Sequence, residues 1–450
     1  MFWVWGIYVL TFLWLIHDAC LLNWHILSSW RWSIERHDDA SLCLKKAPEV
    51  IILLPVLREQ RQLQTTLQAL EDLPYPGRKR IIVVTTEREI AENNGELGGT
   101  TVEITKHILA SRQQQPSSLY EHIHYPWVRG NKASQLNYAF REMTKNQEDL
   151  SACYIGIYDA DSHPAPDTLL RLFELIAREE ERGHSWPIAI QQPALFFGNF
   201  QRVSWYLQLE ALFQTRWVFG HEIRTLRASA RSSCLVPYAY CVGHGMFIRA
   251  DFLARTGGFP EPSEDVPLGH RLTFLALPIH PLPVYDVCDV APRVSALIRQ
   301  SGFWFCNAPL IWREYARLRT FHVSPRKTRS AILLLKGLLD IFSWVHYPLH
   351  LLALSFLLLH GTSFLYALLS LLMCYLDAGV GIVLMLSLFP ACSSLACGRV
   401  VSLRFGRKAW LVLCSPLRNI VRGVAPFLAC WYLIQSLVLK RMNILPKTTR

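Results

Sequence analysis

The chain has 450 residues, is 51% hydrophobic and carries a formal net charge of +11. Basic stripes interleaved with aromatic residues are absent, so we expect no nucleic-acid partner; an anionic membrane leaflet or a nucleotide-sugar accounts for the charge. The 12 cysteines form no CxxC pair and no metal-ligand spacing, which excludes a zinc ribbon, and we interpret them as small hydrophobic residues.

An almost wholly apolar segment opens the chain. Phe2 to Ile16 contains no charge, and Leu21 to Leu27 prolongs it beyond His17 and Asp18. A cleaved signal peptide is the alternative, but the segment lacks a basic start and a clear small-residue cleavage site. The sequence therefore predicts an uncleaved transmembrane helix over residues 1–28.

From about residue 48 to 305 the chain reads as an α/β domain with a mainly parallel sheet. Short apolar runs alternate with longer mixed segments, which is typical of strand–helix units. Leu63, Leu67 and Leu70 repeat at helical spacing and predict a helix over Glu59–Leu73. The expected strands are Val50–Leu54, Arg80–Thr85, His122–Tyr125, Cys153–Tyr158 and Ile188–Gln191.

Two carboxylates, Asp159 and Asp161, follow one of these predicted strands directly. In an open α/β sheet, ligands bind beyond the carboxyl ends of the strands. Mg²⁺ and Mn²⁺ prefer oxygen ligands and commonly share them with substrate phosphates. The pair therefore predicts a divalent cation that holds a nucleotide diphosphate. The alternative is that Asp161 or Ser162 caps a helix that begins near Pro164.

A second acidic group, Glu264 and Asp265, lies about a hundred residues later and precedes another predicted helix. The partial positive charge of a helix N-terminus would stabilise both carboxylates. Glycines in the preceding Gly257-Gly258-Phe259-Pro260 supply tight backbone. The alternative is an ordinary helix start that Ser263 caps.

The C-terminal part is strongly apolar. Residues 331–397 carry only Lys336, Asp340 and Asp377 as charges, and we predict two transmembrane helices within 346–397, at 347–372 and 376–397. Residues 306–345 mix aromatic, apolar and basic residues and predict interfacial helices, with ordinary packed helices as the alternative. Residues 398–450 are expected to form a cytosolic loop and a membrane-associated segment, which is interfacial, re-entrant or one further span.

Basic residues indicate the orientation. Arg31, Arg36, Lys45 and Lys46 follow the first span, and further basic residues, Arg399, Arg404, Arg407 and Lys408, follow the later pair. Because basic residues collect on the cytoplasmic side, both flanks and the α/β domain should lie there. We therefore expect an integral membrane protein with its middle domain in the cytosol.

Four motifs occur in a fixed order between residues 49 and 304. They are Pro55-Val56-Leu57-Arg58-Glu59, Gly130-Asn131-Lys132-Ala133-Ser134-Gln135-Leu136-Asn137, the Asp159 and Asp161 pair, and Ser263-Glu264-Asp265. On these motifs the chain resembles the membrane-bound family 2 glycosyltransferases with a GT-A catalytic domain. That group includes cellulose, chitin, hyaluronan and poly-N-acetylglucosamine synthases and ceramide glucosyltransferase, and the flanking spans also agree with it.

The resemblance implies an inverting, metal-dependent sugar transfer from a nucleotide-sugar, with a UDP-sugar as the expected donor. Asp265 would be the catalytic base, and Asp159 and Asp161 would bind Mg²⁺ or Mn²⁺. The residues expected to contact the nucleotide or its phosphates are Pro55, Glu59, Thr86, Glu87, Lys132 and Asp159. For Thr86 and Glu87, which take the place of the acidic residue that contacts the nucleobase in relatives, a solvated strand end is the alternative. Gly245, Glu264, Gln300 and Trp304 would lie near the acceptor or diphosphate.

The chain departs from the family at its Gln-x-x-Arg-Trp motif. It reads Gln300-Ser301-Gly302-Phe303-Trp304, so Phe303 stands where relatives have arginine. In relatives this motif lies by the acceptor and diphosphate, and the change removes a charge-assisted bond worth roughly 1.5 to 3 kcal/mol. The replacement of this arginine by Phe303 argues against processive synthesis of a polymer. The alternative for these residues is an amphipathic turn with buried aromatic side chains.

Three functions compete at this point. The leading one is transfer of sugar to a growing polysaccharide or glycolipid at a bacterial-type inner membrane, with membrane lipids and a possible export subunit as partners. The second is transfer of a single sugar to a lipid acceptor, a polyprenyl phosphate or a ceramide-like lipid. The third is a catalytically inactive membrane scaffold, although a protein that only binds needs no base at Asp265. A transporter is poorly supported because the apolar segments hold few charges.

Overall fold

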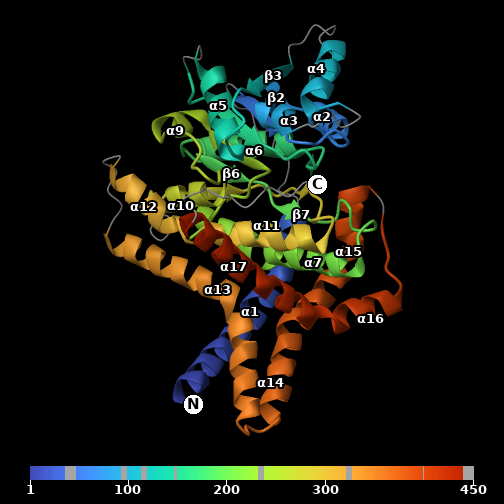
Figure 1. The fold of residues 1–450 in the computed structure, drawn as a ribbon. Coiled ribbons are helices and arrows are strands. Elements are labelled where there is room, and N and C mark those ends of the chain that lie inside the picture. The colour runs from blue at the N-terminus through green and yellow to red at the C-terminus, as the bar shows by residue number, and fades with distance from the viewer. Residues whose placement is uncertain are drawn as a thin grey trace.

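The computed structural model describes residues 1–35, 47–92, 99–112, 119–145, 149–231, 238–320, 327–398 and 400–438. An α/β unit stands on a layer of helices, and an apolar stalk projects from the other side of that layer (Figure 1). Several basic residues used above to predict the orientation, Arg36, Lys45, Lys46 and Arg399, lie outside the described residues. The same holds for residues 439–450 of the predicted C-terminal segment.

A seven-stranded sheet with the order β3-β2-β1-β4-β8-β6-β9 forms the centre of the α/β unit. Neighbouring strands are parallel, except that β8 runs antiparallel to both β4 and β6. A small second sheet pairs β10 with β5 and β7. The strands are β1 (Glu49–Pro55), β2 (Lys79–Thr86), β3 (Tyr120–Tyr125), β4 (Cys153–Ile157), β5 (His163–Pro164), β6 (Ala189–Gln191), β7 (Ala194–Leu195), β8 (Met246–Arg249), β9 (Ile279–Pro281) and β10 (Asp286–Val287).

This sheet confirms a mixed α/β fold that is mostly parallel. The central strands are buried on both faces, which explains why they read as continuous apolar runs. Ile51 and Leu53 of β1 face one core, and Ile52 and Leu54 face the other. The helices of this unit are α2 (Leu63–Glu71), α3 (Glu87–Glu92), α4 (Thr101–Arg112), α5 (Lys132–Thr144), α6 (Thr168–Glu181), α9 (Ala250–Arg255) and α10 (Val266–Phe274).

One predicted helix is shorter than expected. Helix α2 begins at Leu63 and not at Glu59. Arg58, just before the predicted start, has a left-handed φ of 60°, and residues 60–62 form a turn before the helix begins.

A layer of helices lies beneath the sheet and packs against the apolar helices. Its helices are α7 (Trp205–Trp217), the π-helical turn η1 (Val218–Glu222), α8 (Ile223–Arg231), α11 (Val294–Asn307), α12 (Leu310–Thr320), α16 (Phe405–Leu413) and α17 (Ser415–Val438). Buried ion pairs tie α7 to the C-terminal part: Arg216 to Asp377 at 2.5 Å and Arg418 to Glu210 at 2.8 Å.

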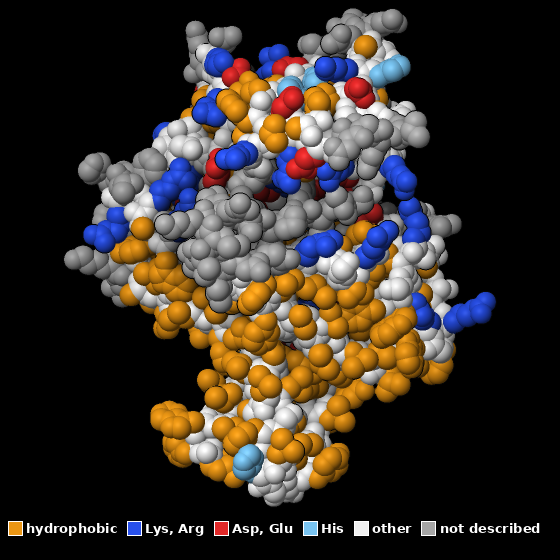
Figure 2. Space-filling model, in the orientation of Figure 1, with side chains coloured by type: hydrophobic (Ala, Val, Ile, Leu, Met, Phe, Trp, Pro, Cys, Tyr) orange, Lys and Arg blue, Asp and Glu red, His pale blue; other side chains and the backbone are white. Residues whose placement is uncertain are grey.

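Three described helices are long and apolar enough to cross a membrane, or four if the bent α16–α17 pair is one span. The stretches of chain that contain them are α1 (Phe2–Ile34), α13 (Lys327–Leu359), and α14 (Leu365–Cys374) with the π-helical turn η2 (Tyr375–Gly379) and α15 (Val380–Cys397). Hydrophobic side chains cover the stalk and the lower body, whereas charged side chains gather on the α/β unit (Figure 2).

The apolar helices do not break where the sequence predicted. The spans 347–372 and 376–397 were expected to meet near residue 374, but the chain turns at residues 360–364, where Gly361 has a φ of 83°. Near residue 374 a π-helical turn continues the helix. The predicted boundary between residues 345 and 346 is also absent, because α13 runs through it; this helix contains Pro348 and is bent along its length (Figure 1).

Candidate active site

A single cavity of about 1590 Å³ joins the α/β unit to the helical layer. Its upper part is lined by Lys132, Asp159, Asp161, Glu264 and Asp265, which three separate motif segments supply. Its lower part is lined by residues of α1, α7, α11, α13 and α17. Ligand pockets usually measure about 300 to 1,000 Å³, so this cavity has room for more than one substrate.

Lys132 lies at the centre of the charged groups. It is the first residue of α5, which Asn131 caps by accepting a hydrogen bond from the Ser134 backbone N–H. Its Nζ lies 2.8 Å from Asp159 Oδ1 and 2.8 Å from Glu264 Oε1, and it donates to the Gly243 carbonyl oxygen at 2.6 Å. Burial disfavours its charge, but the two carboxylates outweigh burial and hold the pKa of Lys132 above its usual range.

Asp159 and Asp161 lie just beyond the carboxyl end of β4, as predicted, and both line the cavity. The Asp159 backbone N–H donates to Ser162 Oγ at 3.1 Å, which shapes the turn between the two carboxylates. Neither Asp161 nor Ser162 caps the following helix, because α6 begins at Thr168 with Asp167 in the cap position. The capping alternative is therefore wrong.

The carboxylate oxygens of this pair are the donors that Mg²⁺ or Mn²⁺ prefers. Asp161 is only 2% exposed, and the cationic Lys132 beside Asp159 belongs to the same group of charges. The residues present therefore fit a divalent cation that shares its coordination sphere with a diphosphate.

Asp265 stands at the N-cap of α10. Its Oδ1 accepts hydrogen bonds from Ser263 Oγ and from the Val266 backbone N–H, both at 2.6 Å. The predicted alternative of a Ser263 cap is wrong, since Asp265 itself caps the helix. With Oδ1 fixed by two donors, Oδ2 is the oxygen that remains for a substrate, and it lies on the side of Gly243.

Glu264 is 6% exposed and pairs with Lys132. Burial raises the pKa of Glu264, Lys132 partly offsets that rise, and the neighbouring Asp265 adds to it. A β-carbon on Gly243 would lie 2.9 Å from Glu264 Oε1 and 3.2 Å from both Asp265 Oδ2 and Lys132 Nζ. The absence of a side chain at residue 243 thus leaves the space in which these groups meet.

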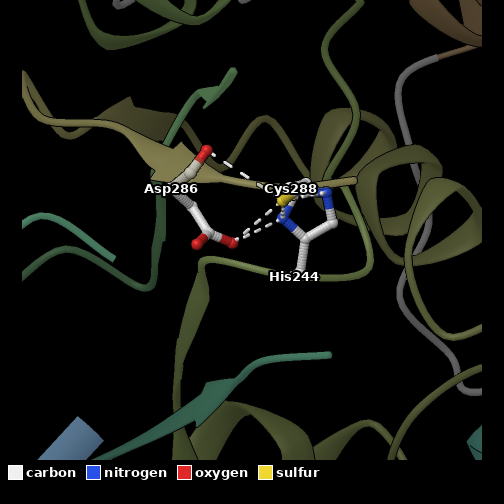
Figure 3. Close-up of side chains that lie close together, drawn as sticks. All are labelled: His244, Asp286 and Cys288. Carbon is white, nitrogen blue, oxygen red and sulfur yellow. Dashed lines mark hydrogen bonds and ion pairs between the residues drawn. The ribbon is translucent and has the colours of Figure 1, made fainter. Parts of the chain in front are cut away.

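Beside this group lies a buried cluster of His244, Asp286 and Cys288 that the sequence did not predict (Figure 3). His244 Nδ1 lies 2.9 Å from Asp286 Oδ2, and Cys288 Sγ lies 3.4 Å from each of these two atoms. Asp286 raises the pKa of His244 against the effect of burial, and Asp159 and Asp161 act in the same direction.

The residues next to His244 in the sequence do not reveal this cluster, because Asp286 lies 42 positions away in β10 and Cys288 follows it. Cys288 is consequently more than a small hydrophobic residue. The three side chains form a candidate metal-ligand group in their own right.

The residues predicted to contact the nucleobase have other partners. Glu87 Oε2 lies 3.0 Å from His124 Nε2, and Thr86 Oγ1 accepts from the Arg88 backbone N–H at 3.3 Å. Pro55 ends β1, and the Glu59 backbone N–H donates to Thr101 Oγ1 at 3.0 Å. The cavity is lined by their neighbours Leu57 and Arg88 and not by these four residues themselves.

Of the residues predicted to lie near the acceptor, Gln300 and Trp304 of α11 line the lower cavity together with Arg299 and Phe303. Gly245 does not line it. This glycine has a φ of 62°, and a β-carbon there would lie 2.9 Å from Gln192 Cβ, so it supports the turn into β8.

No protein-family model and no curated protein sequence matches the chain. The structure is similar to that of the mannosyltransferase PcManGT from Pyrobaculum calidifontis in complex with GDP-Man and Mn²⁺, with a TM-score of 0.55 and 15% identity over 94% of this chain and 99% of that chain. S. aureus TarS 1–349 in complex with UDP-GlcNAc aligns with a TM-score of 0.41 and 10% identity over 88% of this chain and 93% of that one. The first similarity shows that the chain has the fold of a glycosyltransferase.

Proposed function

We propose that the protein is an inverting, metal-dependent glycosyltransferase of family 2 with a GT-A domain. It transfers a sugar from a nucleotide-sugar to a growing polysaccharide or glycolipid at the membrane. The observation that carries this proposal is the meeting of Lys132, Asp159, Asp161, Glu264 and Asp265 in one cavity. The fold shared with a mannosyltransferase supports it.

In this mechanism the acceptor hydroxyl gives its proton to Asp265 Oδ2 as its oxygen attacks the anomeric carbon. Attack from the side opposite the leaving diphosphate inverts the configuration at that carbon. Ser263 Oγ and the Val266 N–H hold the base in place through Oδ1. A positioned general base typically contributes about 10² to 10⁴ in rate.

The diphosphate of the donor is expected to bind at the side of the charged group away from Asp265. Lys132 supplies a fixed positive charge there, and Asp159 and Asp161 would hold Mg²⁺ or Mn²⁺. Such a cation neutralises the negative charge that develops on the leaving diphosphate. A UDP-sugar is the expected donor, and a GDP-sugar belongs in any test because PcManGT was solved with GDP-Man.

The apolar helices set this reaction at a membrane. We propose that α1, the region of α13 beyond Pro348 and the α14–α15 segment cross it and that the α/β unit lies in the cytosol. Transfer of a single sugar to a lipid acceptor is the second candidate. It is favoured by Phe303, which lines the cavity where relatives would place an arginine.

The release of nucleoside diphosphate by the purified full-length protein tests the proposal. A panel of UDP- and GDP-sugars is supplied with Mn²⁺ or Mg²⁺ and a membrane lipid extract as the source of acceptor. We expect release with at least one donor, and a loss of 10²-fold or more in Asp265→Asn with donor binding retained. Asp161→Asn should lose the metal dependence as well as the activity.

The variants must remain folded for this test to count, so the thermal midpoint of each is compared with that of the unmodified protein. Donor binding without release, across the full panel and lipid extract, would contradict the proposed activity and favour the scaffold. Release that is unchanged in Asp265→Asn would remove the assigned base.

A further inference from the structure

The lower part of the cavity contains more basic groups than the transfer mechanism uses. We call this part the membrane-side chamber; it is lined by Trp14, Arg299, Lys336, Trp344, Arg418 and Arg422 among others. It is continuous with the upper part, which holds Lys132 and Asp265. Its charges therefore face the same space as the reaction.

Three cations of the lower cavity have carboxylate partners. Arg418 pairs with Glu210 at 2.8 Å, and Lys336 forms an ion pair with Asp340. Arg216, which also lines the cavity, pairs with Asp377 at 2.5 Å. The pairs of Arg418 and Arg216 join α7 to other segments, the pair of Lys336 lies within α13, and none of the three needs a ligand.

Three further arginines that line the cavity, Arg224, Arg299 and Arg422, have no ion pair and no side-chain hydrogen bond among the described residues. Arg422 is held in place within the chamber, because its guanidinium lies over the ring of Trp344 at 4.1 Å from the ring centre. Trp344 in turn packs edge-on against Phe305 of α11 at 6.2 Å. An arginine that lines a chamber of this kind keeps its charge, and a desolvated charge without a partner is unfavourable. The site is therefore suited to an anion that a ligand brings.

That anion is not expected to be the diphosphate of the donor. Lys132, Asp159 and Asp161 already provide for it at the other end of the cavity. Arg422 instead lies on α17 against α13, and α13 exposes Ile332, Leu335 and Leu338 to at least 55% on its outer side. An anion that binds near Arg422 would therefore belong to a molecule that approaches from the apolar side of the protein. A planar guanidinium matches the oxygens of a phosphate.

We propose that Arg422 binds the phosphate of a lipid-linked acceptor. The lipid tail lies toward the apolar helices, and a hydroxyl-bearing head group extends from the phosphate toward Asp265. The acceptor role rests on the proposed sugar transfer. Phosphate binding at Arg422, in contrast, can be measured without turnover. In the transfer, the head-group hydroxyl oxygen forms a bond to the anomeric carbon and its proton passes to Asp265. The bond from that carbon to the diphosphate breaks, and the diphosphate leaves with the electron pair.

The test measures binding to the full-length protein in detergent by native mass spectrometry and thermal shift. The probes are farnesyl diphosphate and farnesol, which share a tail and differ in the phosphate. A saturating nucleoside diphosphate with Mn²⁺ occupies the donor end throughout, so that neither probe binds there. We expect farnesyl diphosphate to bind about 10- to 100-fold more tightly than farnesol, the range expected of a charge-assisted bond.

Variants assign this preference to one residue. Arg422→Gln should reduce it to about twofold or less, and Arg422→Lys should keep part of it. Arg404→Gln is the matched control, because Arg404 is exposed at the start of α16 and does not line the cavity. Nucleotide binding should be the same in all four proteins.

Equal binding of the two probes by the unmodified protein would overturn the proposal, and so would a preference that survives Arg422→Gln. Inorganic diphosphate distinguishes a lipid head group from a free anion; binding as tight as that of the farnesyl compound would overturn the lipid assignment. A failure of sugar transfer shows itself separately, as the absence of nucleoside diphosphate release from every donor.

Discussion

Gly243 shows how one missing side chain shapes the candidate site. A methyl group there would lie within 3.2 Å of functional atoms of Glu264, Asp265 and Lys132. These are the far ends of side chains, so they can move apart without unfolding the protein, but they then leave the positions that the proposed reaction requires. Turnover is sensitive to such displacements, since a misplacement of about 1 Å can cost about 10²-fold.

We therefore expect Gly243→Ala to lower kcat by about 10²-fold while the thermal midpoint changes little. Steady-state kinetics with the best donor and a melting curve measure both quantities. Gly406→Ala is the control, because nothing lies within 4 Å of a β-carbon at that residue. If Gly243→Ala keeps full activity, the three side chains do not act from the positions described here.

His270 provides a residue-scale test by pH. It is 1% exposed in α10, and its Nε2 lies 2.6 Å from the Tyr238 hydroxyl oxygen. Burial lowers the pKa of His270 to about 3, with a smaller contribution from Lys336. Because the folded-state pKa lies below the unfolded value of about 6.5, the neutral form stabilises the fold above pH 6.5. This contribution is lost as the pH falls toward 3.

We expect His270→Gln to lessen the acid dependence of stability by up to about 1.4 kcal/mol per pH unit below pH 6.5. Thermal midpoints of the variant and the unmodified protein are compared between pH 7 and 4.5. His107→Gln, at an exposed position of α4, should leave the dependence unchanged. If the thermal midpoints of His270→Gln and the unmodified protein change with pH in parallel, the pKa of His270 does not differ between the folded and unfolded states.

The sequence predicted the parts of the site that lie in local motifs. Lys132, Asp159, Asp161, Glu264 and Asp265 are each recognisable within a few residues of chain, and the structure brings them to one cavity. The groups that were missed need contacts across the fold, since His244 meets Asp286 across 42 positions and Arg422 meets Trp344 through the packing of α17 on α13. Periodicity and spacing hold no information on such contacts.

At the scale of elements, the sequence predicted strands β1, β2, β3, β4 and β6 and missed the others, which have two to four residues each. Strands β1 and β2 contain apolar runs whose burial on both faces leaves a clear signal. Strands β5, β7 and β10 have two residues each, and their pairing follows from the positions of their neighbours. The bend of α13 and the turn at residues 360–364 depend on packing in the same way.

Buried ion pairs hold the apolar helices to the layer above them. The side chains of Arg216 and Asp377 are 5% and 7% exposed, and Asn23 of α1 accepts a further hydrogen bond from Arg216 at 3.0 Å. Removal of one partner leaves a buried charge uncompensated, which typically costs about 3 to 5 kcal/mol. The pair therefore ties together three segments of the chain, α1, α7 and η2.

We expect Asp377→Ala to destabilise the protein by about 3 to 5 kcal/mol, seen as a clear fall of the thermal midpoint in detergent. Glu142→Ala is the control, because the side chain of its partner Lys145 is 61% exposed and such a surface pair contributes about 1 kcal/mol or less. A midpoint in Asp377→Ala no lower than that of the control would show that the pair does not hold these segments together.

At the scale of the whole molecule, the proposed topology makes a directional prediction. If α13 and the α14 segment cross the membrane, the turn at residues 360–364 lies on the side opposite the α/β unit. A membrane-impermeant maleimide added to intact cells should label Ser363→Cys and should label Ser151→Cys only after permeabilisation. Native cysteines such as Cys20 and Cys430, which are exposed, are replaced first.

The same label distinguishes the other arrangements. Labelling of both cysteines only after permeabilisation would indicate a re-entrant hairpin, and labelling of Ser151→Cys in intact cells would place the α/β unit outside.

The cavity is assembled from both ends of the chain, and this has a practical consequence. Trp14 comes from the first helix and Arg422 from the last, and both line the same space as Asp265. A soluble fragment cut at residues 48 and 305 would keep the motifs but lose the floor of this space. Such a fragment should still bind nucleotide, but it would lack the part of the cavity that is proposed to bind the acceptor. Its inactivity would therefore not contradict the activity proposed for the intact protein.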